Sequence, residues 1–465
     1  MTDAFDFIVI GGGSAGYAGA SVAAGLGLKV AVIESAAEVG GLCILRGCMP
    51  SKTLLESGHR AEAIRGAGEF GLRAEYLGAD GGAIRARKRR LIGEFAEYRR
   101  GQLESGRFEF IRGLASFTDA HHVEVRLREG GLRRVEGRAF LIATGSRVHC
   151  PEIPGAKEAA PWTSDDVLDS DRIPASLVIL GGGAIGLEAA SFYAGVGARV
   201  TVIQRSGQLL READADVAEA LTTALEARGI TIFRETALVR LERGNGMKRV
   251  VFTHAGSEQA VEAEAIICAL GRRPQTAGLD LERAGLALSA KGVGANAHQQ
   301  SEQAHIFAAG DVCGPHEIVH IAIQQAELAA RNAARLLGKL AGEMEVIDYA
   351  LKIFAIFTHP EVASVGLTER ECGQQGIAFR AASYLFADHG KALVRGAKEG
   401  FVKLLVAPET RRIIGGACVG VEASELIHEI VVAMHFRATA GDLARVPHYH
   451  PTLSEIWTHP AEELT

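Results

Sequence analysis

Short apolar runs that end at glycines form the first regular pattern along this chain. Residues 7–10, Phe-Ile-Val-Ile, predict a buried strand that leads directly into a glycine-rich turn at residues 11–16. An alanine-rich helical stretch follows, and then a second strand at residues 29–34. A strand, a glycine turn, a helix and another strand in this order predict a βαβ unit.

The turn of this unit has the glycine spacing of a dinucleotide-binding loop. Its glycines allow a tight turn, a close approach of the backbone to a pyrophosphate and close packing of helix on strand, while the helix N-terminus faces the phosphates. Glu34 ends the second strand and can accept hydrogen bonds from an adenosine ribose. A purely structural glycine turn is the alternative, but it does not require the strands, the helix and the acid together. We therefore expect a dinucleotide site at Gly11, Gly13, Ser14, Gly16 and Glu34.

The same unit recurs at a constant offset of 170 residues. An apolar strand at residues 178–180 leads into the turn 181–186, and a strand at residues 199–204 follows the next helix. Glu34 corresponds to Gln204 in the second unit, so this unit has lost the acid that binds a ribose. The repeat predicts a second dinucleotide site at Gly181, Gly183, Ile185, Gly186, Gln204 and Arg205.

Two cysteines lie in the run GGLCILRGCMPSK, residues 40–52. Four residues separate Cys43 from Cys48, so one turn can join the two thiols as a disulfide. Pro50 suits the first turn of a helix that begins here, and a helix N-terminus lowers the pKa of a nearby thiol. Zinc binding or an accidental pair are the alternatives, but a second cysteine pair or nearby histidine ligands are missing. The run is a candidate redox centre.

Length and composition indicate a large globular enzyme. A chain of 465 residues is too long for one core and suggests roughly three domains. It is 48% hydrophobic, with 56 glycines and only 12 prolines, which fits a glycine-turn-rich α/β protein. The net charge of −6 gives no global basic field for nucleic acid or anionic lipid. The basic run from Arg85 to Arg90 lies in a predicted helix and indicates a solvated face, so we assign it no function.

The lack of an N-terminal signal pattern and the cysteine usage favour a reducing compartment. Residues 1–7 lack a basic region followed by a long apolar core, and no apolar run approaches ~18 residues. Five of the seven cysteines are scattered singly, which does not form a secreted disulfide framework: Cys150, Cys268, Cys313, Cys372 and Cys418. We expect a cytoplasmic protein with one catalytic disulfide and no membrane or nucleic-acid partner.

Two dinucleotide units around a cysteine pair resemble the class I flavoprotein disulfide reductases, the family of dihydrolipoamide dehydrogenase, glutathione reductase and mercuric reductase. The resemblance spans essentially the whole chain. It rests on the cysteine run and on four motifs that follow in the family's order: Ala143-Thr144-Gly145, Gly271-Arg272-Arg273-Pro274, Ala309-Gly310-Asp311 and His450-Pro451-Thr452-Leu453-Ser454-Glu455.

The resemblance implies an α/β fold with two Rossmann-like domains, one for FAD and one for NAD(P), and a C-terminal α+β dimerisation domain. We expect the FAD domain at residues 1–147 and 271–342, the NAD(P) domain at 148–270 and the dimerisation domain at 343–465. Prolines and glycines punctuate these boundaries. In the last domain, residues 401–406 and 413–419 predict strands, and an amphipathic helix is expected around residues 424–435.

The resemblance also implies the path of the electrons, from a nicotinamide through FAD to a Cys43–Cys48 disulfide. Cys43 would exchange with the substrate disulfide, and Cys48 would be the sulfur next to the flavin. Lys52 matches the family lysine near flavin N5, and Glu188 matches the ion-pair partner of that lysine. Isolated residues of these types are ordinarily on the surface, but here both motif positions are filled together.

Three residues late in the chain complete the implied site. Asp311 matches the acid that binds the ribityl chain of FAD, and a helix cap is its compatible alternative. His450 and Glu455 match the acid–base pair that manages the substrate thiol proton. The family delivers this pair from the other subunit, which implies a homodimer with shared active sites. His448 stays without a role.

The sequence also bears on which disulfide is used. The run HPTLSE favours a dihydrolipoamide dehydrogenase, because glutathione reductases usually have HPTSSE. Ser21 lies where those reductases carry an arginine for the substrate carboxylate, and the tail lacks the paired cysteines of mercuric reductases. We expect a lipoyl group of a carrier protein or a small disulfide as substrate, and an NADPH-dependent disulfide, mercuric or glutathione-type reductase is the alternative. A non-catalytic flavoprotein assembly subunit would lack at least one residue of the chemistry, and all are present.

The preferred nicotinamide is harder to assign. Gln204 replaces the acid that would repel a 2′-phosphate, and Arg205 and Arg211 have the spacing of the arginine pair that holds this phosphate in NADPH-dependent relatives. Two surface arginines are the alternative. Gly186 is a feature of NAD-dependent dehydrogenases. We expect both NAD(H) and NADP(H) to be used, with NADP(H) at least competitive.

Overall fold

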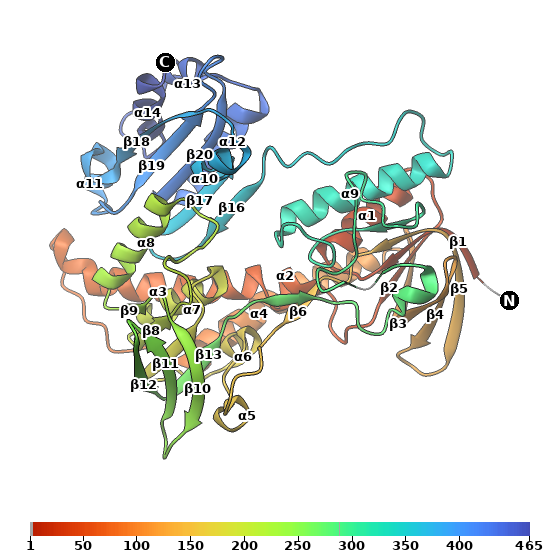
Figure 1. The fold of residues 1–465 in the computed structure, drawn as a ribbon, viewed down its shortest axis with the longest axis horizontal. Coiled ribbons are helices and arrows are strands. Elements are labelled where there is room, and N and C mark those ends of the chain that lie inside the picture. The colour runs from red at the N-terminus through yellow and green to blue at the C-terminus, as the bar shows by residue number, and fades with distance from the viewer. Residues whose placement is uncertain (1–2, 288) are drawn as a thin grey trace. The chain divides into compact units, whose positions relative to one another are not determined.

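The computed structural model describes residues 3–287 and 289–465, and the chain forms two compact units (Figure 1). The first unit contains residues 1–50, 86–149 and 271–348, and the second contains residues 51–85, 150–270 and 349–465. Each unit is therefore built from three separate stretches of the chain, and the two predicted dinucleotide units fall in different ones.

The sheet of the first unit is built around β1 (Asp3–Ile10). This apolar strand pairs in parallel with β2 (Val30–Glu34) and β5 (Leu132–Ile142), and β15 (Ile306–Ala308) pairs in parallel with β5. On the other side β2 pairs in parallel with β3 (Glu109–Asp119), and β4 (His122–Leu127) joins β3 and β5 through antiparallel pairs. Parallel strands with both faces buried are apolar throughout, as residues 7–10 are.

Two helices of the first unit, α1 (Ser14–Gly25) and α9 (Val319–Leu336), pack on each other through small residues. Ala20 and Ala23 of α1 and Ala326 and Ala330 of α9 are completely buried. A Cβ atom on Gly19 would lie 3.2 Å from the carbonyl oxygen of Ala326, so glycine allows the helices to approach this closely. The alanine-rich stretch after the first glycine turn is thus a packing surface.

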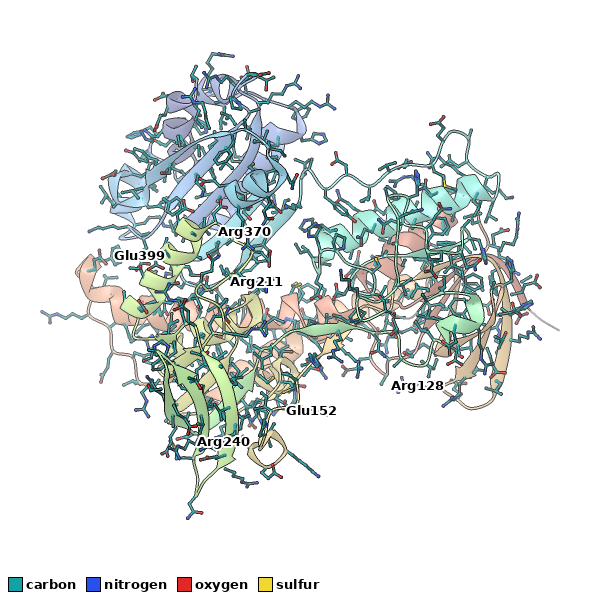
Figure 2. All side chains as sticks on the ribbon, viewed as in Figure 1. Arg128, Glu152, Arg211, Arg240, Arg370 and Glu399 are labelled. Carbon is teal, nitrogen blue, oxygen red and sulfur yellow. The ribbon has the colours of Figure 1, made fainter. Side chains whose placement is uncertain are left out.

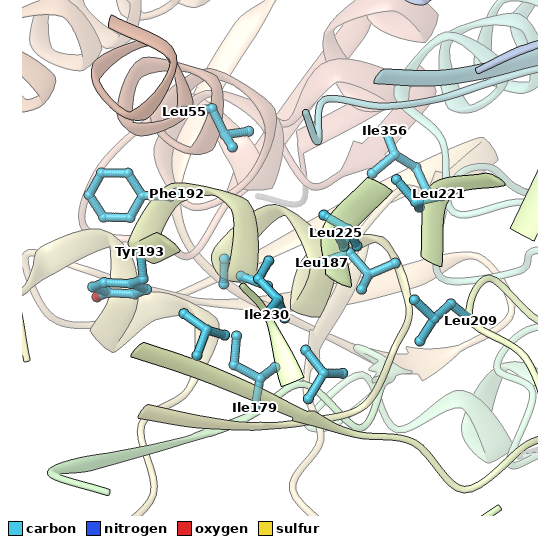
Figure 3. Close-up of a cluster of buried hydrophobic side chains, with 14 of the residues drawn as sticks. Leu55, Ile179, Leu187, Phe192, Tyr193, Leu209, Leu221, Leu225, Ile230 and Ile356 are labelled. Carbon is cyan, nitrogen blue, oxygen red and sulfur yellow. The ribbon is translucent and has the colours of Figure 1, made fainter. Parts of the chain in front are cut away.

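The second unit contains the duplicated βαβ fold. Its parallel sheet has the order β13 (Ala265–Cys268), β7 (Ser176–Leu180), β8 (Arg199–Ile203), β9 (Thr231–Phe233). Helix α7 (Ala184–Gly195) connects β7 to β8, and α8 (Ala215–Ala227) connects β8 to β9. Figure 3 shows the apolar core of this part, where Ile179 and Leu187 lie among side chains that include Leu209, Leu221 and Leu225. An antiparallel sheet is attached, with β10 (Ala237–Arg243), β11 (Lys248–His254) and β12 (Ser257–Ala263).

The C-terminal part of the second unit is an antiparallel sheet of the order β16 (Ile353–Ile356), β17 (Glu361–Gly366), β20 (Ile413–Gly420), β19 (Phe401–Val406), β18 (Arg380–Leu385). Helix α12 (Ala423–His435) packs on this sheet, as the predicted amphipathic pattern requires. The strands predicted at residues 401–406 and 413–419 are confirmed.

The remaining elements are short connections and two long helices, α3 (Cys48–Arg65) and α4 (Gly81–Leu103). The connections are α2 (Gly41–Leu45), β6 (Ser146–Val148), α5 (Ala156–Ala159), α6 (Ser164–Asp169), β14 (Arg272–Pro274), α10 (Glu369–Gln375), α11 (Gly390–Val394), α13 (Ala440–Ala444) and α14 (Thr458–Glu463), with 3₁₀ turns at Gly66–Phe70, Leu281–Ala284, Phe386–Asp388 and Ser454–Trp457.

One sequence-based expectation about α4 needs correction. Arg87, Arg89 and Arg90 are exposed, as a solvated face predicts, but Lys88 is only 3% exposed. Lys88 and Ile92 lie one helical turn apart on the same face, and Ile92 is also buried, so the packed stripe of the helix includes this lysine.

Candidate functional site

The predicted FAD motifs meet at one edge of the first sheet. Strands β1, β5 and β15 run in parallel and end at Ile10, Ile142 and Ala308. The glycine turn, the Ala143–Gly145 motif and the Ala309–Asp311 motif each follow one of these strand ends. Because the carboxyl ends of parallel strands share an edge of the sheet, the fold gathers three motifs that are far apart in the sequence.

The glycine turn before α1 has the geometry that a dinucleotide needs. Gly11 has a φ of +110°, and a Cβ atom there would lie 2.4 Å from the carbonyl oxygen of Ala143. A Cβ atom on Gly16 would lie 1.8 Å from the carbonyl oxygen of Gly11, so neither glycine can be replaced without a shift of the backbone. No side chain caps the N-terminus of α1, and its first turn, which begins with Ser14, has no acidic residue. The first N–H groups of α1 therefore suit the pyrophosphate of FAD.

Glu34 lies directly beside this turn. It is 8% exposed, and its Oε2 accepts a hydrogen bond from the backbone N–H of Gly12 over 2.8 Å. Its Oε1 accepts from the backbone N–H of Ala36 over 2.7 Å. Two backbone donors fix the carboxylate in the orientation from which its remaining lone pairs can accept from ribose hydroxyls.

Asp311 belongs to a small polar network within the first unit. Its Oδ2 accepts a hydrogen bond from Ser146 Oγ over 2.6 Å, and Arg272 Nε donates to the same Ser146 Oγ over 2.8 Å. Thr144 Oγ1 donates to the carbonyl oxygen of Gln275 over 2.6 Å, which ties the strand ends together. Gly145 and Gly271 have φ values of +71° and +121°, so both turns favour glycine. The network holds the Asp311 carboxylate at the edge where the motifs meet.

The cysteine run folds into two consecutive helices. Cys43 lies in α2 and Cys48 is the first residue of α3, as predicted from Pro50. A Cβ atom on Gly47 would lie 3.2 Å from the Cα atom of Cys43 and 2.9 Å from the carbonyl oxygen of Leu42. Gly47 therefore permits the tight turn between α2, which contains Cys43, and α3, which begins at Cys48.

A second close contact joins this run to the dinucleotide turn. A Cβ atom on Gly41 would lie 2.5 Å from the Cα atom of Gly13, and Gly41 has a φ of +69°. Two glycines that touch through their backbones thus place the start of the cysteine run directly against the FAD turn.

Arg99 is a residue that the sequence reasoning missed. Its guanidinium carbon lies 4.1 Å from the ring centroid of Tyr17, and its Nε and Nη1 atoms are buried without a hydrogen-bond partner. Burial lowers the pKa of this guanidinium, while the charges of Tyr17 and Cys43 favour its charged form. Arg99 is therefore a partly buried cation on the first unit. The signal in the sequence was weak, because Arg99 lies in a helix rich in charged residues.

The second dinucleotide turn repeats the first one in detail. Gly181 has a φ of +107°, and a Cβ atom there would lie 2.4 Å from the carbonyl oxygen of Ala269. Gly182 donates its backbone N–H to Gln204 Oε1 over 2.8 Å, as Gly12 does to Glu34 in the first unit. Gln204 therefore keeps the bond to the turn but replaces the charge by a neutral amide.

The turn is also open to a ligand. A Cβ atom on Gly183 would meet no atom within 4 Å, and this residue begins the uncapped N-terminus of α7, where Ile185 is 42% exposed. A Cβ atom on Gly186 would lie 2.2 Å from the carbonyl oxygen of Gly181, so alanine cannot replace it without a backbone shift. These features fit the pyrophosphate of NAD(P).

The two arginines near Gln204 are both exposed. Arg211 makes an ion pair with the neighbouring Glu212 over 3.2 Å, and its carbonyl oxygen accepts a hydrogen bond from Arg370. Figure 2 labels Arg211 and Arg370, which lie close together in the view. An exposed ion pair of this kind is weak, so the guanidinium of Arg211 can exchange Glu212 for a phosphate at little cost.

Lys52 and Glu188 form the expected ion pair in the second unit. Lys52 Nζ lies 2.7 Å from Glu188 Oε1 and 3.0 Å from Oε2. The backbone N–H of Phe357 donates to Glu188 Oε1 over 3.2 Å, and Lys52 Nζ lies 4.5 Å from the centre of the Phe357 ring. Lys52 lies one helical turn after Cys48 on α3, so one helix fixes both residues.

His450 and Glu455 are also paired. His450 Nδ1 lies 2.9 Å from Glu455 Oε1, and Glu455 Oε2 accepts from the backbone N–H of Thr452 over 2.8 Å. That N–H and the imidazole hold the pKa of the Glu455 carboxyl below its ordinary value. The His450 side chain is 80% exposed. His448 forms a separate pair with Glu429 over 2.7 Å.

Two further findings concern the described part of the chain. Within residues 3–287 and 289–465, no group of three or more His, Cys, Asp and Glu side chains could hold a metal ion. None of the helices described is long and apolar enough to cross a membrane.

One contact between cysteines was not predicted from the sequence. Cys150 and Cys268 are free thiols, and their sulfur atoms lie 2.7 Å apart. The reason is that the segment between them begins and ends beside two paired strands, which a count of cysteine spacings cannot reveal.

Comparisons with known proteins identify the family of this chain. Residues 5–326 match the pyridine nucleotide-disulphide oxidoreductase family, and residues 354–461 match its dimerisation domain. The chain is 36% identical to a dihydrolipoyl dehydrogenase of Thermus scotoductus, over 99% of this chain and 97% of the relative, and 32% identical to one of Bacillus subtilis, over 96% of each.

Solved structures of flavoprotein disulfide reductases are also similar to this chain over its length. LpdA from Mycobacterium tuberculosis has a TM-score of 0.88 and 28% identity, over 99% of this chain and 100% of that chain. The HOCl-induced flavoprotein disulfide reductase RclA from Escherichia coli has a TM-score of 0.86 and 26% identity, over 100% of both chains.

Proposed function

Because the chain belongs to the pyridine nucleotide-disulfide oxidoreductase family, we propose that it oxidises a dihydrolipoyl group through Cys43 and Cys48 and passes the electrons to NAD(P)⁺. The chain is an FAD- and NAD(P)-dependent disulfide oxidoreductase of the dihydrolipoyl dehydrogenase type. The single observation that carries the proposal is the backbone contact of Gly47 on Cys43, which folds Cys48 back toward it at the start of α3.

The residues for the two cofactors follow from the two turns. Gly11, Gly13, Gly16 and Glu34, with Asp311, would hold FAD, and Gly181, Gly183 and Gly186, with Gln204, would hold the nicotinamide nucleotide. When bound, FAD supplies the two-electron chemistry that links a dithiol to a nicotinamide. By its match to the family lysine, Lys52, which is held by Glu188, would supply a positive charge for the flavin ring.

The protein's own thiols carry the exchange with substrate. One substrate thiolate attacks Cys43 Sγ, the Cys43–Cys48 bond breaks, and Cys48 leaves as a thiolate. The second substrate thiolate then attacks its own mixed disulfide, which releases the oxidised dithiolane and leaves Cys43 reduced. Two sulfurs of the substrate are oxidised and two of the protein are reduced.

His450 would receive the substrate thiol protons at Nε2, because Glu455 engages Nδ1. The imidazole is 80% exposed, and we propose that it acts in the partner subunit of a homodimer. Large exposed apolar side chains on the same part of the chain support an interface there: Val432, Phe436, Val446 and Tyr449. Residues 343–465 would form this dimerisation domain, with the FAD domain at 1–147 and 271–342 and the NAD(P) domain at 148–270.

The substrate proposal predicts the ranking of steady-state rates. We expect kcat/KM for dihydrolipoamide with NAD(P)⁺, and for lipoamide with NAD(P)H, to exceed that for glutathione disulfide or Hg(II) by at least about a hundredfold, which is about 2.7 kcal/mol. Ser21 provides no cation for a glutathione carboxylate. A rate with glutathione disulfide or Hg(II) equal to that with lipoamide would contradict the proposal.

The two exposed arginines, Arg205 and Arg211, predict how the enzyme distinguishes NADPH from NADH. Replacing both Arg205 and Arg211 by alanine should lower kcat/KM for NADPH at least about tenfold and leave that for NADH within about threefold, because only NADPH has a 2′-phosphate for guanidinium groups. Arg199→Ala is the matched control, since Arg199 is exposed at the opposite end of β8 and should affect neither cofactor.

A wild-type preference for NADH above about a hundredfold that stays unchanged in the double variant would show that these arginines do not bind the phosphate.

A further inference from the structure

Two cysteines outside the catalytic run meet in the second unit. Cys150 is exposed and donates its S–H to Cys268 Sγ, with the sulfur atoms 2.7 Å apart. Cys268 is the last residue of β13 and is 2% exposed. A disulfide bond is about 2.05 Å long, so a small movement of either side chain would bring the two sulfurs to bonding distance.

The chain path explains why these sulfurs meet. The segment 150–270 follows β6 directly and ends directly before β14. Strands β6 and β14 are paired antiparallel, with Val148 opposite Arg272, so the chain enters and leaves the segment side by side. The contact is therefore a consequence of the topology of the fold.

We propose that Cys150 and Cys268 form a second redox-active pair, which low-molecular-weight disulfides oxidise to an intramolecular disulfide. The Cys150 thiolate attacks one sulfur of the small disulfide, forms a mixed disulfide and releases one thiolate. Cys268 Sγ then attacks Cys150 Sγ, the mixed disulfide breaks, and the second small thiolate leaves. Two protein thiols are oxidised, one small disulfide is reduced, and the two protons go to the released thiolates.

The environment of the two sulfurs sets the order of these steps. Burial, followed by the interaction with Cys150, raises the pKa of the Cys268 thiol to about 12. A buried thiol of this kind reacts slowly with dissolved reagents, whereas Cys150 is open to solvent. Cys150 is therefore the attacking residue, and Cys268 the one that resolves the mixed disulfide.

The proposed Cys150–Cys268 disulfide would hold the end of β13 beside the glycine turn of the nicotinamide site. Cys268 is followed by Ala269, whose carbonyl oxygen lies against Gly181, the first glycine of that turn. Nearly the whole segment 150–270 would also become a closed loop. A cross-link of a long loop lowers the entropy of the unfolded chain and so stabilises the folded segment.

Peptide mapping tests the proposal on the full-length FAD enzyme. The enzyme is reduced, desalted, exposed to glutathione disulfide, alkylated after denaturation and digested with trypsin. Cys150 lies in the tryptic peptide 148–157 and Cys268 in 250–272, whereas the catalytic pair falls in 30–46 and 47–52. We expect a linked peptide 148–157/250–272 that has lost two hydrogens and separates on reduction, while the peptide with Cys418 stays fully alkylated.

Two comparisons make the result decisive. Cys150→Ser should lose this linked peptide and keep the catalytic one, and the oxidised wild type should unfold at a higher temperature than oxidised Cys150→Ser. In the native reduced enzyme, Cys150 should be alkylated at least about tenfold faster than Cys268. The proposal is overturned if Cys150 and Cys268 are recovered as alkylated thiols, or Cys150 only as its glutathione mixed disulfide, in a sample whose catalytic peptides are linked.

Discussion

Replacing Cys43 or Cys48 by serine should lower lipoamide turnover at least about a thousandfold, which is about 4 kcal/mol of transition-state stabilisation, while FAD stays bound. Thiol exchange needs one sulfur to meet the substrate and another to leave, and serine can do neither. FAD binding depends instead on the glycine turn, Glu34 and Asp311, which these changes do not touch.

The measurement combines steady-state lipoamide reduction with the flavin absorbance of the purified variants. Cys150→Ser is the control under reducing conditions, because it removes an exposed thiol outside the run 40–52 and should keep full turnover and full flavin content. Near-wild-type activity in either the Cys43 or the Cys48 variant would rule out the proposed exchange.

Mixed dimers should recover activity from two inactive chains, because each active site is proposed to use His450 from one subunit and Cys43 from the other. His450→Ala and Cys43→Ser homodimers should each be nearly inactive. A heterodimer of the two contains one site with both residues intact, so it should reach up to about half the turnover of a wild-type dimer.

The experiment needs heterodimers purified with two different tags. Heterodimers of wild type with Cys43→Ser serve as the control, since they should show about half activity whichever subunit supplies His450. If verified heterodimers of the two inactive chains show no recovery, each chain completes its own site, and the 80% exposure of His450 needs another explanation.

The sequence determined the repeated units and the chemistry in them. Glycines at a fixed offset, an apolar strand before each turn and a polar residue after the second strand are local features, so residues 7–34 and 178–204 predicted both βαβ units. The start of α3 was also predictable, because Cys48 and Pro50 lie within its first turn. The strands at 401–406 and 413–419 followed from their apolar runs and the turn between them.

Only the tertiary structure decided which distant residues meet. The Gly41–Gly13 contact and the position of Arg99 beside Tyr17 each join segments that no local pattern connects. The Lys52–Glu188 pair was expected only because both residues match motifs of the family. The burial of Lys88 depends on how its helix packs, which the charge pattern alone cannot reveal.

Cys150 and Cys268 show most clearly why the sequence alone could not predict which residues meet. In the sequence they are two single cysteines, and a long segment separates them. The pairing of β6 with β14 brings the two ends of that segment together. Two strands pair only where the whole fold places their backbone N–H and C=O groups opposite each other. Local residue types determined which groups could react, and long-range strand pairing determined which of them are neighbours.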